Sequence, residues 1–202
     1  MHHSSFWIKI DDMASHVALL RGINLGGRNK IAMADLREVV TSLGHTGVTT
    51  YIQSGNVLFT AADAGNAALA SQLEAAIAEA FGVASSVVVL TRDELAQVLR
   101  DNPYPDEPNP RLVHVVFLNA EPPQDLLDRI AAAQSAAAAK GGRDTIQAIG
   151  RALFLHTPDG FGNSELAQVL FRIVGSSGKT SVAATARNWA TAAKLLSLCE
   201  AR

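Results

Sequence analysis

The order of apolar segments in the first half of the chain constrains the fold more than any other feature. Short apolar stretches are typical of β-strands, whereas apolar residues spaced three or four apart, such as Leu36, Val40 and Leu43, indicate amphipathic helices. Gly44 and Gly82 follow the two helical stretches, where glycine commonly ends a helix. The resulting order is β-α-β-β-α-β, the ferredoxin-like pattern. We predict strands over residues 17–20, 48–54, 57–60 and 86–90, and helices over residues 33–43 and 67–81.

The second half of the chain repeats most of this order. A connecting helix over residues 91–100 and a proline-rich loop over residues 102–110 lead into it. No final strand is evident, so this half has the order β-α-β-β-α. We therefore expect an α/β (α+β) fold of two ferredoxin-like βαββα(β) repeats packed together, with a C-terminal helix. The predicted segments are a strand at 112–118, a helix at 123–139, a hairpin at 145–149 and 152–156, a helix at 164–174, a loop at 176–181 and a closing helix at 188–198.

The beginning of the chain resembles an expression tag or a vector-derived segment. It starts Met1-His2-His3-Ser4-Ser5, and Met13 has the character of a natural start. We assign residues 1–12 to this segment, residues 13–92 to the first repeat, residues 93–184 to the second repeat with its connecting helix, and residues 185–202 to the C-terminal helix.

Composition excludes several classes of partner. The formal net charge is −2 and the isoelectric point is near 6.3, which disfavours the broad basic face of a nucleic-acid-binding protein. No apolar run approaches the ~18 residues of a membrane helix, so we expect no membrane partner. A single cysteine, Cys199, cannot form an internal disulfide, which is typical of a cytoplasmic protein. An exposed edge strand in the incomplete second half favours a homodimer.

Glycine-rich polar turns predict a binding site. In a β-α-β-β-α-β unit the first and third strands are antiparallel neighbours, so the turn leaving the first lies beside the start of the third. An arginine guanidinium suits phosphate or carboxylate, and the nearby start of the first helix also favours anions. We predict that a small anionic or nucleotide-like ligand binds at Arg21, Gly22, Asn24, Gly26, Gly27, Lys30, Ser54, Gly55, Asn56, Arg187 and Asn188.

The same residues also have a purely structural interpretation. We expect Arg21 to hold the anion, with Arg187 reaching into the cleft, and Asn24 and Asn56 either to orient the ligand or to brace the turns. Alternatively, the glycines only make turns, Arg21 pairs with a carboxylate, and Thr185 or Asn188 caps the last helix. An Arg21→Ala variant that loses ligand but stays folded separates the two interpretations.

The sequence shows no catalytic constellation. A general base would have to be His45, His114, His156 or a carboxylate, and nothing in the sequence places one beside the glycine-rich turns. The histidines are too scattered to predict a metal site, and catalytic residues and cofactors are unknown. The alternatives to a ligand-binding protein are a protein- or nucleic-acid-interaction module that uses an open sheet face, and an enzyme of unidentified reaction.

Three motifs together resemble a family of bacterial proteins. They are the segments at residues 18–27, 50–57 and 185–191, supported by residues 30–33 and 102–104. In this order they are similar to the uncharacterised family called domain of unknown function 1697, over nearly the whole chain. The resemblance implies an α/β fold with two ferredoxin-like repeats, and it implies no activity. Ala186 and Ala190 depart from it, since more polar residues are typical there.

Overall fold

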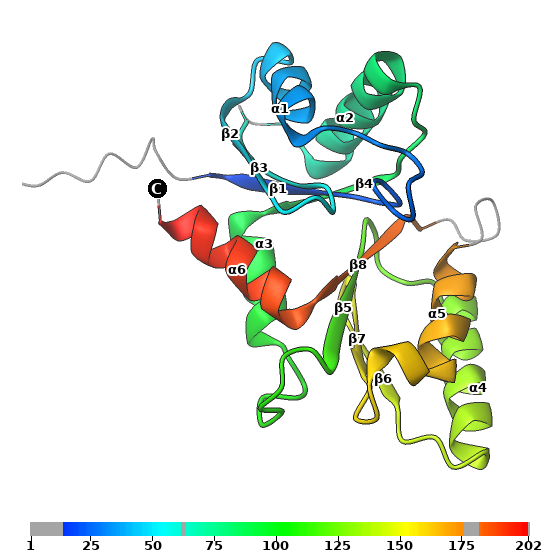
Figure 1. Ribbon diagram of the computed structural model, residues 1–202. Helices are drawn as coiled ribbons and strands as arrows, with labels where there is room; N and C mark the ends of the chain where they lie inside the picture. The colour runs from blue at the N-terminus through cyan, green and yellow to red at the C-terminus, as the bar shows by residue number, and fades with distance from the viewer. Residues whose placement is uncertain (1–13, 62–63, 176–181, 202) are drawn as a thin grey trace, which may run out of the picture.

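The structure of the protein is a computed structural model that describes residues 14–61, 64–175 and 182–201. It contains two four-stranded antiparallel sheets, each with a pair of helices on its outer face (Figure 1). The predicted α/β fold of two ferredoxin-like repeats is therefore confirmed. The predicted tag at residues 1–12 and the predicted loop at residues 176–181 lie outside the described residues.

The first repeat has the predicted topology. Its sheet has the strand order β2-β3-β1-β4, so β1 lies between β3 and β4 and is antiparallel to both. The hairpin turn occupies residues 52–55, so β2 ends at Tyr51, three residues before the predicted strand end at 54, and Asn56 opens β3 instead of lying in the turn. The elements are β1 His16–Leu20, α1 Met33–Ser42, β2 Thr46–Tyr51, β3 Asn56–Thr60, α2 Asn66–Phe81 and β4 Val87–Thr91.

The second repeat corrects one prediction. Its sheet has the order β6-β7-β5-β8, and β8 is the final strand that the sequence did not reveal. The C-terminal helix accordingly begins at Trp189 and not at residue 185. The elements are α3 Arg92–Arg100, β5 Val113–Leu118, α4 Gln124–Ala139, β6 Thr145–Ile149, β7 Ala152–His156, a 3-10 turn η2 Phe161–Asn163, α5 Glu165–Gly175, β8 Ala184–Asn188 and α6 Trp189–Glu200.

The sequence of β8 explains why it was missed. Its residues Ala-Thr-Ala-Arg-Asn contain no large apolar side chain, so the alternation that marks a half-buried strand is absent. Thr185 and Arg187 are nevertheless buried, because their face of the strand packs against the first repeat. With β8 in place the second half is a complete β-α-β-β-α-β unit, and the edge strands of its sheet are β6 and β8.

The two repeats share a core between their sheets. Val17 and Leu19 of β1 belong to the same buried cluster as Val115 and Phe117 of β5. The side chains that alternate with them face the helices of their own repeat. Helices α3 and α6 pack together beside this shared core, below the first sheet (Figure 1). This packing brings the end of β1 next to β8, which creates the candidate site.

Candidate functional site

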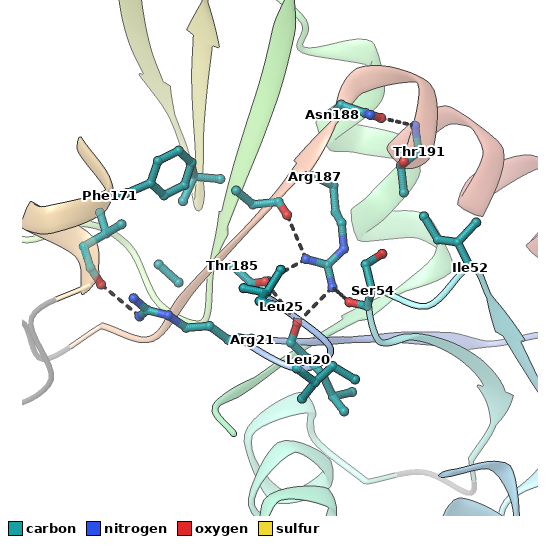
Figure 2. Close-up of a pocket in the computed structure, with 16 residues that line it drawn as sticks. Leu20, Arg21, Leu25, Ile52, Ser54, Phe171, Thr185, Arg187, Asn188 and Thr191 are labelled. Atoms are coloured by element: carbon teal, nitrogen blue, oxygen red, sulfur yellow. Dashed lines mark hydrogen bonds between the residues drawn. The ribbon is translucent and has the colours of Figure 1, made fainter. Parts of the chain in front are cut away.

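A cavity of about 510 Å³ lies where the two repeats meet. We call it the inter-repeat cavity. Its walls are the turn that follows β1, the β2–β3 turn, the end of α5, the start of α6 and all five residues of β8 (Figure 2). The volume is in the range of small-molecule sites. The turn after β1 and the β2–β3 turn do converge here, as the ferredoxin-like topology predicts.

Arg187 is the most highly bonded side chain in the cavity wall. It belongs to β8 and is only 9% exposed. Its Nη2 donates to Leu20 O and Ser54 O, each at 2.9 Å, and Nη1 donates to Ala186 O at 2.7 Å (Figure 2). The remaining bonds go from Nε to Asn56 Oδ1, from Nη1 to Thr185 Oγ1 and from Nη2 to Gly55 O.

These bonds make Arg187 a clamp between the repeats. All five of its N–H donors are engaged by neutral oxygens, so the side chain has no donor left for a ligand. Burial lowers the pKa of Arg187 to about 10, which keeps the guanidinium charged at neutral pH. Among the described residues it forms no ion pair with a carboxylate. Arg187 therefore contributes positive potential to the cavity, while its donors are used in hydrogen bonds within the protein.

Arg21 lies on the same wall, and the hydrogen bonds found for its side chain use only part of its donors. Its Nη1 donates to Val174 O, in the last turn of α5, at 3.0 Å, and no other hydrogen bond of this side chain is found within the described part of the chain. A cation at the C-terminal end of a helix is stabilised by the helix dipole. The half-buried guanidinium lines the cavity, so its remaining donors are placed to bind an anion.

The two predicted asparagines brace the turns. Asn24 has a φ of +53° and its side chain bonds both the N–H and the carbonyl of Ile31 as well as Gln53 O. Asn56 is fully buried and donates to Tyr51 O and Ser54 Oγ while accepting from Arg187. Neither side chain lines the cavity, so the bracing alternative describes both.

The predicted glycines are needed mainly for the backbone conformation of the turns, and less to let a ligand approach. A Cβ on Gly55 would lie 2.7 Å from Leu20 Cβ, and its φ is +74°, so only glycine fits there. Gly22, Gly26 and Gly27 have positive φ with open space around them, so they shape the turn. Of the predicted residues, Arg21, Gly22, Ser54, Arg187 and Asn188 line the cavity, whereas Asn24, Gly26, Gly27, Lys30, Gly55 and Asn56 do not.

Asn188 has a structural role as well. Its Oδ1 accepts from Thr191 N at 2.8 Å and caps α6, so Asn188 is the cap and Thr185, the other predicted candidate, is not. No residue of α1 lines the cavity, so the start of that helix does not contribute to the site. The cavity thus lies where the two polar turns meet, and five of the eleven predicted residues line it.

The sequence did not identify the apolar part of the cavity. Val116, Phe171 and Val174 line it from the second repeat, and Leu25 and Ile52 line it from the first. Leu25 and Ile52 are 64% and 50% exposed, which is unusual for large aliphatic side chains. Ile52 also has a φ of +50°, a strained conformation for a β-branched residue. No local pattern marks Ile52, because its neighbours Tyr51 and Gln53 suggest only an ordinary strand end.

The candidate general bases lie away from the cavity. None of His45, His114 and His156 lines it. Burial lowers the pKa of His114 to about 4, and its ring stacks on Phe161 with centroids 4.1 Å apart. Within the described residues, no group of three or more His, Cys, Asp or Glu side chains is arranged to hold a metal ion.

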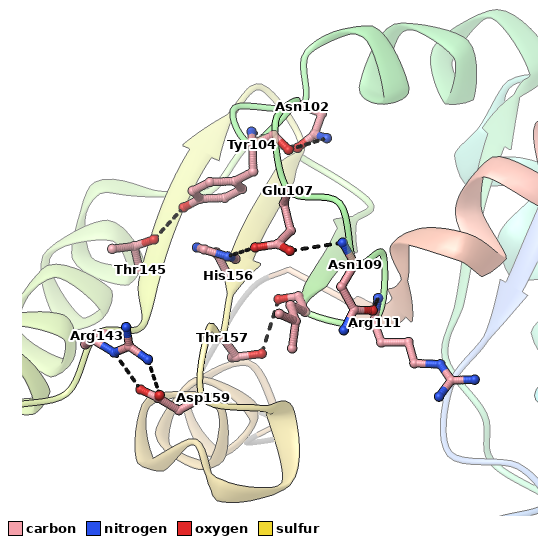
Figure 3. A network of polar contacts seen from close by, with 11 residues as sticks. Asn102, Tyr104, Glu107, Asn109, Arg111, Arg143, Thr145, His156, Thr157 and Asp159 are labelled. Atoms are coloured by element: carbon pink, nitrogen blue, oxygen red, sulfur yellow. Dashed lines mark hydrogen bonds and ion pairs between the residues drawn. The ribbon is translucent and has the colours of Figure 1, made fainter.

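His156 belongs to a second polar network that anchors the proline-rich loop (Figure 3). Its Nε2 lies 2.7 Å from Glu107 Oε2, and its ring packs against Tyr104, whose hydroxyl is 2.8 Å from Thr145 Oγ1. The pKa of Glu107 is lowered, first by the backbone N–H of Asn109 and then by His156. These contacts hold residues 104–109 against β6 and β7, which is a structural function.

Comparison with known proteins agrees with this fold. Residues 13–154 match the family described as Protein of unknown function (DUF1697). A solved structure of a conserved bacterial protein from Streptococcus pneumoniae superposes with a TM-score of 0.67 at 24% identity, covering 93% of this chain and 99% of the other. No curated protein matches. Across the described residues, no helix is both long and apolar enough to span a membrane.

Proposed function

Since the chain belongs to the DUF1697 family of proteins of unknown function, we propose a function from the geometry of the cavity: the protein binds a small organic anion between its two repeats. Arg21 holds the negative charge, and the apolar wall receives the rest of the ligand. One observation carries the proposal: two arginines from different repeats line one cavity, and neither pairs with a carboxylate among the described residues.

The charge distribution supports an anionic ligand. Arg187 is buried and its charge is not neutralised by any described carboxylate, so an anion entering the cavity lowers the electrostatic energy of a charge that is already there. Arg21 is partly exposed and supplies direct hydrogen bonds. A guanidinium offers paired donors to carboxylate or phosphate, whereas Arg187 acts only through its field.

The apolar wall supports an organic ligand. Val116, Phe171 and Val174 present only hydrocarbon to the cavity, and an inorganic ion leaves this surface uncovered. Of the two arginines, only Arg21 has donors without a partner among the described residues. The site therefore suits one carboxylate or one phosphate monoester better than a polyphosphate. Nucleotide-like ligands therefore fit as monophosphates. The single Cys199 makes a cytoplasmic location part of the same proposal.

The experiment is a thermal-shift screen followed by calorimetry. The panel contains N-acetyl amino acids, short fatty acids, sugar phosphates and nucleoside monophosphates. We expect at least one class to raise the Tm of the wild-type protein. Arg21→Gln should weaken that ligand at least tenfold, and Arg21→Lys should retain part of the affinity because it keeps the charge but loses the planar fork.

Arg28→Gln is the matched control, because Arg28 is exposed on the same turn and does not line the cavity. It removes the same net charge and should leave the affinity within about twofold, as expected for a screened surface charge. Equal loss of affinity in Arg21→Gln and Arg28→Gln would refute the role of Arg21. If no compound in the panel raises the Tm of the folded wild-type protein, the proposed function is refuted.

The interaction-module alternative is favoured by the cavity rim. Leu25 and Ile52 expose aliphatic surface on two adjacent turns, and exposed apolar groups at a cavity mouth are typical of a partner-binding surface. Nothing among the described residues favours catalysis to the same degree.

A further inference from the structure

The strand β8 is an edge strand whose whole length lines the inter-repeat cavity. In the order β6-β7-β5-β8 it has only one neighbour, so its other edge has no strand partner in the sheet. Both Ala186, from one face of the strand, and Thr185, from the opposite face, line the cavity. Because successive side chains point to opposite faces, a cavity lined by both faces follows the edge of the strand.

The register shows which backbone groups point to that edge. Asn119 N donates to Ala183 O at 3.0 Å, so the bonded pairs between β5 and β8 continue at Thr185 and Arg187. In an antiparallel ladder the alternate residues direct their N–H and C=O groups to the other side. Ala184 and Ala186 therefore present theirs to the free edge. The contact of Ala186 O with Arg187 Nη1 agrees with this orientation.

We infer that the anion is the C-terminal carboxylate of a short extended peptide, which adds to the free edge of β8 as an antiparallel strand. The inference rests on the proposed function and identifies its ligand. Strand addition to an exposed sheet edge is a common mode of peptide recognition. The side chains of Ala184 and Ala186 pack in the core of the second repeat, so these residues offer only backbone groups to a chain at the edge.

The positions of the arginines set the direction and the end group. Arg21 lies beside the start of β8, and Arg187 lies nearer its end (Figure 2). An antiparallel peptide ends beside the start of β8, which places its carboxylate next to the free donors of Arg21. The opposite direction places an ammonium group there, which Arg21 repels. Ala186 O already accepts a hydrogen bond from Arg187. The peptide therefore pairs mainly with the part of β8 near Arg21.

The length and side chains of the ligand follow from the walls. Five residues of β8 extend about 17 Å at ~3.4 Å per residue, and half of that edge accommodates about three peptide residues. Phe171 and Val174 on one side and Leu25 and Ile52 on the other form the apolar surroundings of the ligand side chains. A short apolar peptide with a free carboxylate can contact the apolar walls, pair with the edge of β8 and reach Arg21 at the same time.

The test compares three probes on the full chain by calorimetry: the acetylated tripeptide alanyl-valyl-leucine, its C-terminal amide, and acetyl-leucine. We expect the tripeptide acid to bind at least tenfold more tightly than either of the others. Arg21→Gln should remove the advantage of the acid over the amide, and Arg28→Gln should leave it unchanged. Amide hydrogen exchange then reports the binding mode, because strand addition slows exchange at Ala184 and Ala186.

The outcomes separate the two proposals. If acetyl-leucine binds as tightly as the tripeptide, or if the bound tripeptide leaves exchange in β8 unchanged, the strand-addition inference is wrong while anion binding survives. If none of these carboxylates binds but a sugar phosphate or nucleoside monophosphate does, the ligand is not a peptide. If no anion of any kind binds, both proposals fail together.

Discussion

Replacing Arg187 with methionine should destabilise the protein by about 4 kcal/mol. Methionine keeps much of the aliphatic stem, so the main loss is in hydrogen bonds. Leu20 O and Gly55 O retain other donors, from Thr185 Oγ1 and Leu20 N respectively. Asn56 Oδ1, Ser54 O and Ala186 O have no other donor among the described residues. A buried acceptor left without a partner costs ~1–3 kcal/mol, so about 2 kcal/mol for the buried Asn56 Oδ1 and about 1 kcal/mol for each of the two half-buried carbonyls give about 4 kcal/mol.

Urea unfolding followed by circular dichroism measures this loss. Wild type, Arg187→Met and Arg187→Lys are compared with Arg28→Met, which removes an exposed arginine from the turn beside the cavity. We expect Arg28→Met to change the free energy of unfolding by less than about 0.5 kcal/mol. Arg187→Lys should fall between the two, because an ammonium keeps the charge but has only three donors. A loss below about 1 kcal/mol in Arg187→Met would show that the clamp is not structural.

Three further predictions concern the turns and His114. Gly55→Ala should lower the free energy of unfolding in urea by about 3 kcal/mol, because the new Cβ contacts Leu20 and the left-handed φ is unfavourable for alanine. Gly22→Ala has open space around the new Cβ and should lose only about 1 kcal/mol, from the φ alone. Equal losses in the two variants would contradict the packing argument. Ile52→Asn should raise the free energy of unfolding by about 0.5 kcal/mol, because asparagine tolerates φ +50°, and a decrease would show that the exposed isoleucine side chain contributes to stability. The pKa of His114 is about 4 in the folded protein and near 6.5 when unfolded, so only the unfolded chain binds a proton between these values. Stability should therefore fall as the pH falls from 6.5 to 4, by about 1–2 kcal/mol after solvent screening of this half-buried ring, and His114→Gln should remove that part of the pH dependence.

The convergence of the two polar turns followed from local patterns in the sequence. Hydrophobic periodicity identified β1 and β3, and the β-α-β-β-α-β order made them neighbours, so the turn at Arg21 and the turn at Ser54 had to converge. The sequence also reduced the cap of the last helix to two candidates, Thr185 and Asn188, because capping depends on residues three positions apart, and the structure shows that Asn188 is the cap. These features depend on short-range geometry, which neighbouring residues determine.

The roles of the individual side chains depended on contacts between distant parts of the chain. Arg187 has the same sequence neighbourhood whether it binds a ligand or clamps two repeats, and its partners Asn56 and Leu20 are 131 and 167 positions away. The strand β8 likewise exists because β5 pairs with it, since its own residues are too small and polar to signal a strand. The sequence by itself determined the order of elements as far as α5 and the place where the polar turns meet. Only tertiary packing decided that Arg187 is buried with every donor used, while Arg21 keeps donors that find no partner among the described residues. Burial and hydrogen-bond satisfaction are properties of residues brought together from both repeats.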